Sequence, residues 1–493
     1  MEHVDVVVVG AGLSGVGAAC RLELGRPGTS YVVLESRDAI GGTWDLFRYP
    51  GVRSDSDMHT LGYPFRPWLD GEALADGPSI LRYIRDTARE LGVERHVRLQ
   101  HRVVRADWSR DTARWTVHVE RSDTGEQLSL TCRFLYSCTG YYRYDHGHDP
   151  DIPGREDFAG TVVHPQLWPT DLDVTGQRVV VIGSGATAIT LVPALAQTAA
   201  HVVMLQRTPT YVTALPSRDK LADLARRVLD ADTAYRVVRR KNIAMAGLSY
   251  RVSQRWPRVM RNLLLRDAAK QLPEGYDVER DFGPSYKPWD QRLCVVPDGD
   301  LFTAIREGRA SVVTDTIERY TRDGLRTTSG VDVPADVVVT ATGLELMLMG
   351  GTVLSVDGVD VDPTQTVAYK GMMLTGLPNF AFAVGYTNAS WTLKCDLVSR
   401  YVCRLLDELD ATGNDVVVPV PPEDPQRLPL IDLTSGYIQR AIAGLPTQGV
   451  RPPWRIYQNN RKDVRMLVHG DVDDEGVRFR RLPVAQRTEG ASR

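Results

Sequence analysis

Two glycine-rich loops, each placed directly after a short apolar strand, constrain this chain more than any other feature. The first, GAGLSG at residues 10–15, follows the run Val6–Val9, and the second, GSGATA at residues 183–188, follows the apolar run 178–182. A loop of this kind joins a buried strand to a helix, and the free N–H groups at the start of that helix favour the pyrophosphate of a dinucleotide. The chain is therefore predicted to contain two dinucleotide-binding units.

The first loop fits FAD or NAD better than NADP. Glu35 ends the apolar run 31–34, about twenty residues after the last glycine, where a carboxylate accepts hydrogen bonds from a ribose diol. The same carboxylate would repel a 2′-phosphate. A glycine-rich turn without a ligand is the alternative.

Residues 101–104 are expected to form a strand whose backbone can contact the adenine of the dinucleotide. Ordinary packing in a sheet is the alternative role for this strand. The candidate FAD contacts are Gly10, Gly12, Ser14, Gly15, Glu35 and Val103.

The second loop fits NADPH. The strand after it, 201–205, ends in Gln206-Arg207-Thr208 instead of an acid. A guanidinium pairs bidentately with a phosphate dianion, and Thr208 can add a hydroxyl donor. The alternative is that Arg207 is a solvated surface charge. The candidate NADP contacts in this unit are Gly183, Ser184, Gly185, Ala186, Thr187, Ala188, Ile189, Arg207 and Thr208.

One nucleotide-binding unit is expected to be inserted into the other, because the apolar strands 135–140 and 337–343 both end in Thr-Gly where the chain would pass between units. The predicted fold class is α/β, with two Rossmann-like dinucleotide-binding domains, the NADP domain inserted into the FAD domain, and a helical excursion. The expected ranges are 1–140 (FAD domain, first part), 141–175 (linker), 176–343 (NADP domain, with the helical excursion at 217–280), 344–475 (FAD domain, second part) and 476–493 (tail).

Composition argues against several other classes of protein. A formal net charge of −3 over 493 residues lacks the excess of positive charge typical of nucleic-acid binders. No stretch approaches the ~20 apolar residues that a membrane span needs, and the start MEHVDVVVVG lacks the pattern of a signal peptide. The six cysteines are scattered without CxxC or metal-ligand spacing, which favours free thiols, no metal and a cytoplasmic location.

Three further segments resemble a flavoprotein family. Residues 158–169, FAGTVVHPQLWP, fit the pattern FxGxxxHxxxW followed by Pro or Asp, the fingerprint of type I Baeyer–Villiger monooxygenases. Residues 41–55, GGTWDLFRYPGVRSD, and 286–292, YKPWDQR, resemble the same family, most closely its ethionamide-activating branch. The resemblance implies an FAD-containing, NADPH- and O₂-dependent enzyme. Such an enzyme forms a C4a-peroxyflavin and inserts oxygen next to a ketone carbonyl, giving an ester or lactone, with thioether sulfoxidation as an accessible second activity.

The resemblance also implies roles for individual residues. Arg53 and Ser54 would lie near both cofactors. Asp55 matches an aspartate beside the flavin that orients a catalytic arginine, and Arg292 matches that arginine. A guanidinium is permanently charged, so it can stabilise an anionic peroxide and then the oxyanion formed at the carbonyl. A salt bridge with Asp290 is the alternative role for Arg292. The matches to the family's loop over the flavin are Gly42, Thr43, Trp44, Asp45 and Leu46.

Residues 217–271 depart from the alternation of strands and helices. They carry fourteen Lys and Arg against five Asp, a net charge of +9, with apolar residues at helical spacing. Such a segment can form a solvated helical cap over the substrate entrance, which is the favoured interpretation, or make peripheral contact with an anionic membrane. Residues 141–149, YYRYDHGHD, are expected to form a surface loop.

Other functions share parts of this pattern. An N- or S-oxidising flavin monooxygenase would use a protonated hydroperoxyflavin and would not need Arg292. A pyridine-nucleotide disulfide reductase would need a redox-active cysteine pair, which the chain lacks. A nucleotide-binding redox sensor would need neither Arg292 nor Asp55. The expected partners are therefore a small ketone or thioether and O₂, with no nucleic acid.

Overall fold

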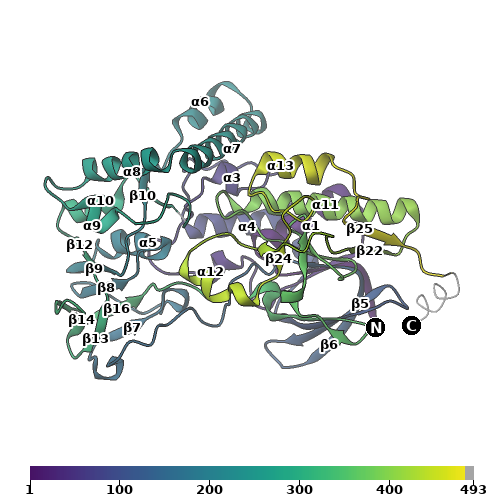
Figure 1. Ribbon diagram of the computed structural model, residues 1–493, viewed down its shortest axis with the longest axis horizontal. Helices are drawn as coiled ribbons and strands as arrows, with labels where there is room; N and C mark the ends of the chain where they lie inside the picture. The colour runs from purple at the N-terminus through teal and green to yellow at the C-terminus, as the bar shows by residue number, and fades with distance from the viewer. Residues whose placement is uncertain (292, 484–493) are drawn as a thin grey trace.

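The computed structural model describes residues 1–291 and 293–483, so Arg292 and residues 484–493 lie outside the described part. Two sheets lie side by side, with a row of helices along one edge of the molecule (Figure 1). Within the described ranges, no helix combines the length and the apolar character that crossing a bilayer requires.

The first sheet has nine strands in the order β18-β17-β4-β5-β6-β1-β2-β3, with β21 paired to β6. The central strand β1 is buried on both faces from Val6 to Val9 and runs parallel to β2 and β6, as expected for a strand of β-branched residues. The strands are β1 (Glu2–Val9), β2 (Tyr31–Leu34), β3 (Val97–Arg98), β4 (His101–Ser109), β5 (Arg114–Arg121), β6 (Gln127–Ser137), β17 (Val353–Val356), β18 (Val359–Asp360) and β21 (Phe380–Phe382).

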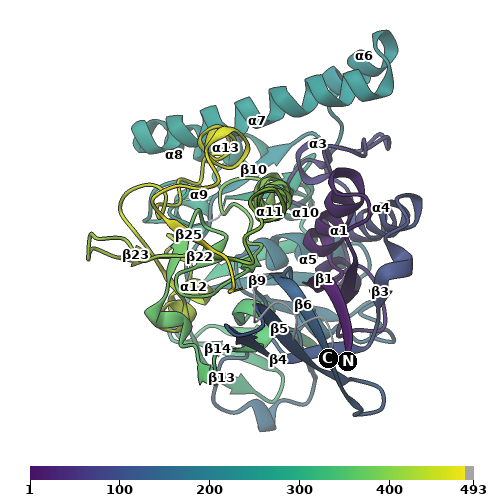
Figure 2. The same cartoon turned by 90° about the vertical axis from the view of Figure 1, so that its right-hand side faces the viewer.

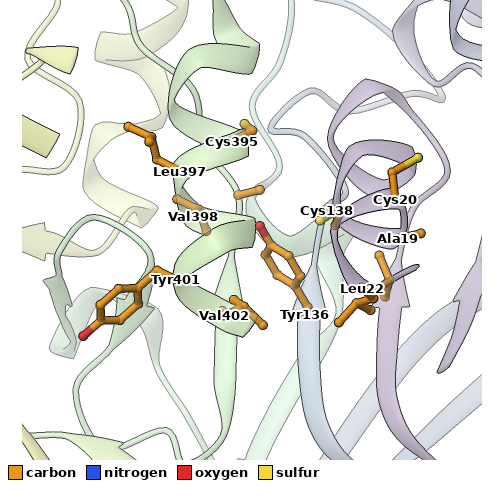
Figure 3. Close-up of a cluster of buried hydrophobic side chains, with 14 of the residues drawn as sticks. Ala19, Cys20, Leu22, Tyr136, Cys138, Cys395, Leu397, Val398, Tyr401 and Val402 are labelled. Carbon is orange, nitrogen blue, oxygen red and sulfur yellow. The ribbon is translucent and has the colours of Figure 1, made fainter. Parts of the chain in front are cut away.

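Helices α1 (Leu13–Gly25) and α11 (Trp391–Thr412) pack against each other beside this sheet, with α4 (Gly77–Glu90) next to α1. Figure 3 shows the buried cluster that they form with β6, in which Leu22 of α1, Tyr136 of β6 and Val398 of α11 are labelled. The hydroxyl of Tyr136 lies 3.0 Å from that of Ser399, so even this buried phenol has a hydrogen-bond partner. The first glycine loop is thus held between a central strand and a packed pair of helices.

The second sheet has five parallel strands in the order β12-β9-β8-β16-β7. They are β7 (Thr161–Val163), β8 (Arg178–Ile182), β9 (His201–Gln206), β12 (Ala310–Thr314) and β16 (Val337–Thr340). Helices α5 (Ala186–Leu195) and α10 (Asp300–Arg306) contact this sheet, and β13 (Ile317–Thr321), β14 (Gly324–Thr327) and β15 (Asp332–Pro334) form a small antiparallel sheet. The edge strand of the five-stranded sheet, β7, belongs to the fingerprint segment 158–169.

The order of these strands along the chain confirms the predicted fold class. All strands of the second sheet lie between residues 161 and 340, whereas the first sheet uses strands before residue 138 and after residue 352. The second unit is therefore inserted into the first. The prediction of a separate tail from residue 476 onwards is wrong for residues 477–480. These residues form β25 (Val477–Arg480), which pairs with β22 (Val416–Pro419) and so belongs to the folded chain.

Four helices form the excursion: α6 (Lys220–Val228), α7 (Ala231–Arg255), α8 (Pro257–Gln271) and α9 (Val278–Phe282). Asp219 and Asp230 cap the first two by accepting backbone N–H groups, and Pro257 separates α7 from α8. In the two views at right angles, α6, α7 and α8 lie along the same edge of the molecule (Figures 1 and 2).

The remaining elements connect these units. They are α2 (Thr43–Leu46), α3 (Met58–Leu61), α12 (Gly436–Ala441), α13 (Asn460–Val464), β10 (Val212–Leu215), β11 (Cys294–Pro297), β19 (Val367–Tyr369), β20 (Met373–Leu374), β23 (Leu428–Pro429) and β24 (Thr447–Gln448), together with short 3₁₀ turns.

The closeness of the first glycine loop to its own helix gives a test of the fold. A Cβ on Gly15 would lie 1.8 Å from the carbonyl oxygen of Gly10. Gly15→Ala should therefore lower the free energy of unfolding by about 3 kcal/mol and abolish flavin retention. The control is Gly247→Ala in α7, where the added methyl would meet no atom within 4 Å apart from its chain neighbours and the nearby backbone of its own helix. The control should retain flavin and gain up to ~1 kcal/mol of helix stability. Urea unfolding and flavin absorbance of the purified proteins measure both, and equal behaviour of the two variants would contradict this account.

Candidate active site

A cavity of about 470 Å³ lies at the carboxyl ends of β1, β2 and β6 and reaches the start of α5 in the second unit. Ligands of open parallel sheets bind in this position, outside the carboxyl ends of the strands. The lining residues come from segments as far apart in sequence as Gly10 and Trp391. No described residue of 217–271 lines this cavity, so a cap over the substrate entrance stays a prediction.

Glu35 holds the backbone of the first glycine loop in place through a hydrogen bond. Its carboxylate accepts the N–H of Ala11 at 2.7 Å and that of Arg37 at 2.9 Å, and the side chain still lines the cavity. Burial raises the pKa of Glu35, while these two N–H donors favour its charged form. Val103 lies at the same end of the cavity, where its carbonyl accepts the hydroxyl of Thr352. The structure thus brings together Gly10, Gly12, Ser14, Glu35 and Val103, as expected for one dinucleotide site.

The segment 41–46 packs directly onto the first loop. A Cβ on Gly42 would lie 2.8 Å from the Cα of Gly12, and Gly42 has a φ of +58°, which also favours glycine. Gly42, Thr43 and Trp44 line the cavity, whereas Asp45 and Leu46 do not. The reason is that their N–H groups bond to Gly42 within α2, and the Asp45 carboxylate is bound by Arg37 at 2.5 Å and Arg85 at 2.8 Å. Asp45 is therefore an anchor of the loop.

The segment 141–149 is more than the surface loop that was expected. Tyr141 stacks on Trp391 with ring centroids 5.0 Å apart, and Trp391 donates its indole N–H to Ser14 at 2.8 Å. The hydroxyl of Tyr144 lies 3.4 Å from that of Thr43, and burial raises the pKa of Tyr144 to about 12. Both tyrosines line the cavity. The surface-loop prediction is wrong for this part of the segment; its run of aromatic residues directly after β6 was the signal that could have indicated a wall.

Arg53, Ser54 and Asp55 all line the cavity, and the roles beside the cofactors that the resemblance implies for them stay predictions. Arg53 spans the two units, because its guanidinium binds Asp300 at the start of α10 with an N–O distance of 2.6 Å. Burial raises the pKa of Asp300, and the charge of Arg53 opposes that shift. Arg292, the expected catalytic arginine, lies outside the described residues.

The second glycine loop leaves space for a ligand in front of it. No described atom lies within 4 Å of a Cβ built on Gly185, and α5 begins at the next residue. Ser184 donates its hydroxyl to the carbonyl oxygen of Thr208 at 2.8 Å, so this loop and the end of β9 are fixed together. Ala186 and Thr187 line the cavity. Gly183 packs its backbone on Ala341, and Ala188 and Ile189 are buried in the core of this unit, so their side chains pack against protein.

Arg440 in α12 carries a positive charge that is influenced by that of Arg207, the arginine at the predicted 2′-phosphate position. Arg207 is exposed at the end of β9. Burial lowers the pKa of Arg440 in α12, and the like charge of Arg207 lowers it further, whereas Glu345 opposes this effect. The like charge of Arg207 thus disfavours the charged form of Arg440, an effect that a bound phosphate dianion would oppose. Sequence reasoning missed Arg440 because it lies more than 200 residues after Arg207.

A buried ion pair supports the wall opposite the first loop. Tyr386 lines the cavity and donates its hydroxyl to Asp463 at 2.6 Å. Asp463 in turn binds the ammonium of Lys394 at 3.1 Å, and Lys394 also donates to the carbonyl oxygen of Lys370 at 3.2 Å. The Lys394 and Asp463 side chains are 3% and 0% exposed, so the pair is desolvated as well as bonded.

Removing one partner of this pair should destabilise the protein strongly, because the other charge would stay buried without compensation. Lys394→Met should lower the free energy of unfolding by about 3–5 kcal/mol. The matched control is Arg326→Met, which breaks an exposed pair with Asp332 and should barely move the unfolding midpoint. Urea unfolding of the flavin-loaded protein measures both. A similar midpoint for the two variants would show that the buried pair does not stabilise this wall.

The arginine pair gives a test of nucleotide preference. Arg207→Gln should raise the KM for NADPH about tenfold to a hundredfold, because one charged hydrogen-bonding partner of the 2′-phosphate is lost, and should leave the KM for NADH nearly unchanged. Arg440→Gln should act in the same direction. Initial rates of nucleotide oxidation with both coenzymes measure the effect, and an equal change for NADH and NADPH would exclude a 2′-phosphate role.

Comparison with known proteins agrees with this geometry. Residues 3–348 match the family model described as flavin-binding monooxygenase-like. The chain is 55% identical over 484 residues to the FAD-containing monooxygenase EthA of Mycobacterium tuberculosis (strain H37Rv), which covers 98% of this chain and 99% of that protein. It is 45% identical over 484 residues to the probable FAD-binding monooxygenase AlmA of Acinetobacter baylyi, with 97% and 96% covered.

Solved structures share the fold over nearly the whole chain. Oxidized steroid monooxygenase bound to NADP aligns with a TM-score of 0.75 at 23% identity, and the open form of cyclohexanone monooxygenase with a TM-score of 0.74 at 19% identity. Each alignment covers 97% of this chain and 100% of the other, and at these identities the likeness shows the fold alone. The family match spans more than half of the sequence and the curated relatives match nearly all of it, so the chain belongs to the flavin-binding monooxygenase-like family.

Proposed function

We propose that this flavin monooxygenase inserts one oxygen atom of O₂ next to a ketone carbonyl, giving an ester or lactone, with sulfoxidation of thioethers as a second activity. The observation that carries the proposal is the fingerprint segment 158–169, which resembles that of Baeyer–Villiger enzymes and joins the second sheet to the wall of the cavity. The other oxygen atom leaves as water, and NADPH supplies the two electrons.

The fingerprint makes this junction through β7 and the turn that follows it. β7 pairs with β16 of the second sheet, and Gln166 in the following turn donates to the carbonyl oxygen of Arg143 at 2.8 Å. Arg143 lines the cavity. His164 accepts the N–H of Gln166 at 3.2 Å, and burial lowers its pKa, which favours the neutral ring that can accept. The segment is therefore suited to couple movement of the second unit to the cavity.

The cofactors expected from the sequence, FAD and NADPH, fit the residues present. The first glycine loop, Glu35 and the segment 41–44 would hold FAD, and the second loop with Arg207 and Arg440 would hold NADPH. The curated relatives are named as FAD-containing or FAD-binding, and OTEMO, a fold neighbour at a TM-score of 0.69, was solved in complex with FAD and NADP. When bound, FAD accepts hydride from NADPH and activates O₂.

The protein's own contribution to the reaction would be binding, orientation and charge. Arg53 lies between the two units and at the cavity, so it can contact both cofactors while its salt bridge to Asp300 holds it in place. Arg292 would supply a permanent positive charge for the oxyanion that forms when the carbonyl is attacked, and Asp55 at the cavity wall would orient that guanidinium.

The test separates flavin reduction from oxygen transfer. Arg292→Ala should keep FAD and still oxidise NADPH, but its rate of ester formation should fall by about 10²–10³ because one stabiliser of the oxyanion is lost. Hydrogen peroxide should account for the NADPH consumed. The matched control is Arg322→Ala, which removes an exposed arginine between β13 and β14 and should leave all three readouts unchanged.

Parallel assays of NADPH, peroxide and ester decide between the alternatives. Normal ester yield from Arg292→Ala would remove the proposed role of this arginine. A parent enzyme that oxidises amines or thioethers but no ketone would favour the N- or S-oxidising monooxygenase, for which Arg292 is not needed.

A further inference from the structure

The outward surface of α6, α7 and α8 has no part in the site described above. These helices lie along one edge of the molecule in both views (Figures 1 and 2). Ten of the nineteen exposed large apolar side chains among the described residues fall within residues 217–271. An exposed apolar patch of this kind marks a surface that is covered in function.

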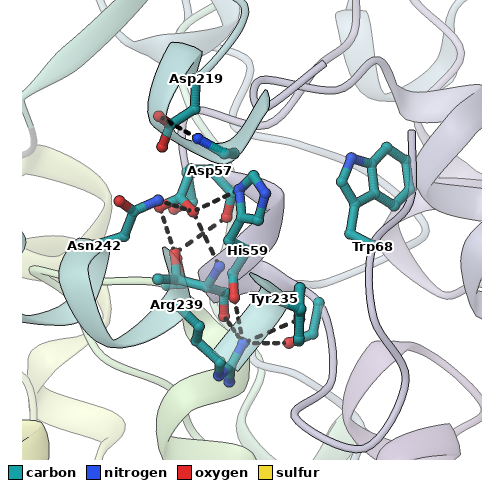
Figure 4. A network of polar contacts seen from close by, with 12 residues as sticks. Asp57, His59, Trp68, Asp219, Tyr235, Arg239 and Asn242 are labelled. Carbon is teal, nitrogen blue, oxygen red and sulfur yellow. Dashed lines mark hydrogen bonds and ion pairs between the residues drawn. The ribbon is translucent and has the colours of Figure 1, made fainter. Parts of the chain in front are cut away.

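The inward face of α7 is fixed to the first unit, which determines which side faces out. Figure 4 shows Arg239 reaching into the segment 57–63, where it donates to the carbonyl oxygen of His59 at 2.6 Å and to that of Gly62 at 2.8 Å. Asn242 donates to the Asp57 carboxylate at 2.8 Å. Arg239 is 8% exposed, so these contacts are desolvated and α7 cannot rotate without breaking them.

The outward face of α7 alternates apolar and basic side chains. Val237, Arg240, Leu248, Arg251 and Arg255 are all exposed and follow one another at spacings that place them on a single helix face, opposite Arg239 and Asn242. Val237 is 49% and Leu248 53% exposed.

The outward face of α8 continues the same pattern. Val259, Leu263, Arg266 and Lys270 are exposed at spacings of three and four residues, and Trp256 is 54% exposed at the break between α7 and α8. Both helices therefore present an exposed face that mixes apolar and basic side chains.

The positive charge of this surface is not balanced locally. Ten of the fourteen Lys and Arg in residues 217–271 are exposed, against two of the five Asp. None of these ten forms an ion pair with another residue in the part of the chain that the structure describes. Because the whole chain carries −3 and this segment +9, the rest of the chain carries −12. The electrostatic potential is thus polarised towards one edge.

We propose that this outward surface binds peripherally to an anionic phospholipid bilayer. Interfacial helices of this type bury their apolar side chains at the headgroup boundary, while the long arginine and lysine side chains reach the phosphates. Trp256 is exposed between α7 and α8, and tryptophan is a residue type that favours the membrane interface. A nucleic acid would satisfy the arginines but leave the exposed Leu, Val and Met side chains without a partner.

The helix that carries much of the proposed membrane surface also packs on the YKPWDQR segment. Tyr250, also on α7, packs edge-to-face on Trp289 of the YKPWDQR segment, with ring centroids 6.0 Å apart. The helix that would lie on the bilayer therefore contacts the segment that ends at Arg292.

Flotation of the full-length, FAD-loaded protein with lipid vesicles tests the proposal. Phosphatidylcholine vesicles containing phosphatidylglycerol should carry the protein to the top of the gradient at low salt, and pure phosphatidylcholine vesicles should not. Arg240→Glu combined with Arg251→Glu should weaken binding at least about tenfold, since each basic residue near such a surface contributes substantially. Met245→Ser combined with Leu248→Ser leaves the charge unchanged and should also weaken binding several-fold.

A matched control carries the same charge change elsewhere. Arg322→Glu combined with Arg326→Glu alters two exposed arginines near the β13–β14 turn, which lies at the lower edge of Figure 1 whereas α6 lies at its upper edge, and should float like the parent. All variants should retain FAD and NADPH oxidation in solution, which verifies folding. Failure of the parent to float with anionic vesicles, or equal loss in the control, would overturn the proposal. Loss with the charge variant but full binding by the serine variant would also overturn it and assign the surface to a polyanion.

Discussion

The close approach of the first glycine loop, residues 10–15, to the segment 41–46 is the constraint on which the rest of the site depends. The backbone at Gly12 and that at Gly42 lie so near each other that a side chain on Gly42 would overlap the first loop. Glu35 accepts a backbone N–H of the first glycine loop, and Asp45 anchors the segment 41–46 through Arg37 and Arg85. The loop and the segment therefore form one rigid wall of the cavity. Preorganisation of this kind is what a cofactor site needs if bound atoms are to react at fixed distances.

Arg53 extends that wall across the boundary between the two units. Its salt bridge to Asp300 connects a loop of the first unit to α10 of the second, while the fingerprint segment connects β7 to the loop that contains Arg143. Two independent contacts therefore tie the position of the second unit to one cavity. This arrangement suits the proposed reaction, in which the nucleotide held by one unit reduces the flavin held by the other.

The features that local sequence determines were predicted well, and those that depend on tertiary contacts were not. The runs 31–34 and 178–182 became β2 and β8 with the expected bounds, and the flavoprotein monooxygenase class is confirmed by the family match. Arg440 and the buried pair of Lys394 and Asp463 could not be predicted, since each acquires its role from a partner far away in the sequence.

The most direct test of the central claim is to follow the atoms of O₂. NADPH-reduced enzyme is mixed with isotopically labelled O₂ and a methyl ketone, and the products are analysed by mass spectrometry. Oxygen transfer within one cavity predicts an ester that carries one labelled oxygen atom, formed in step with the NADPH consumed. Unchanged ketone together with labelled hydrogen peroxide in place of the ester would contradict the account.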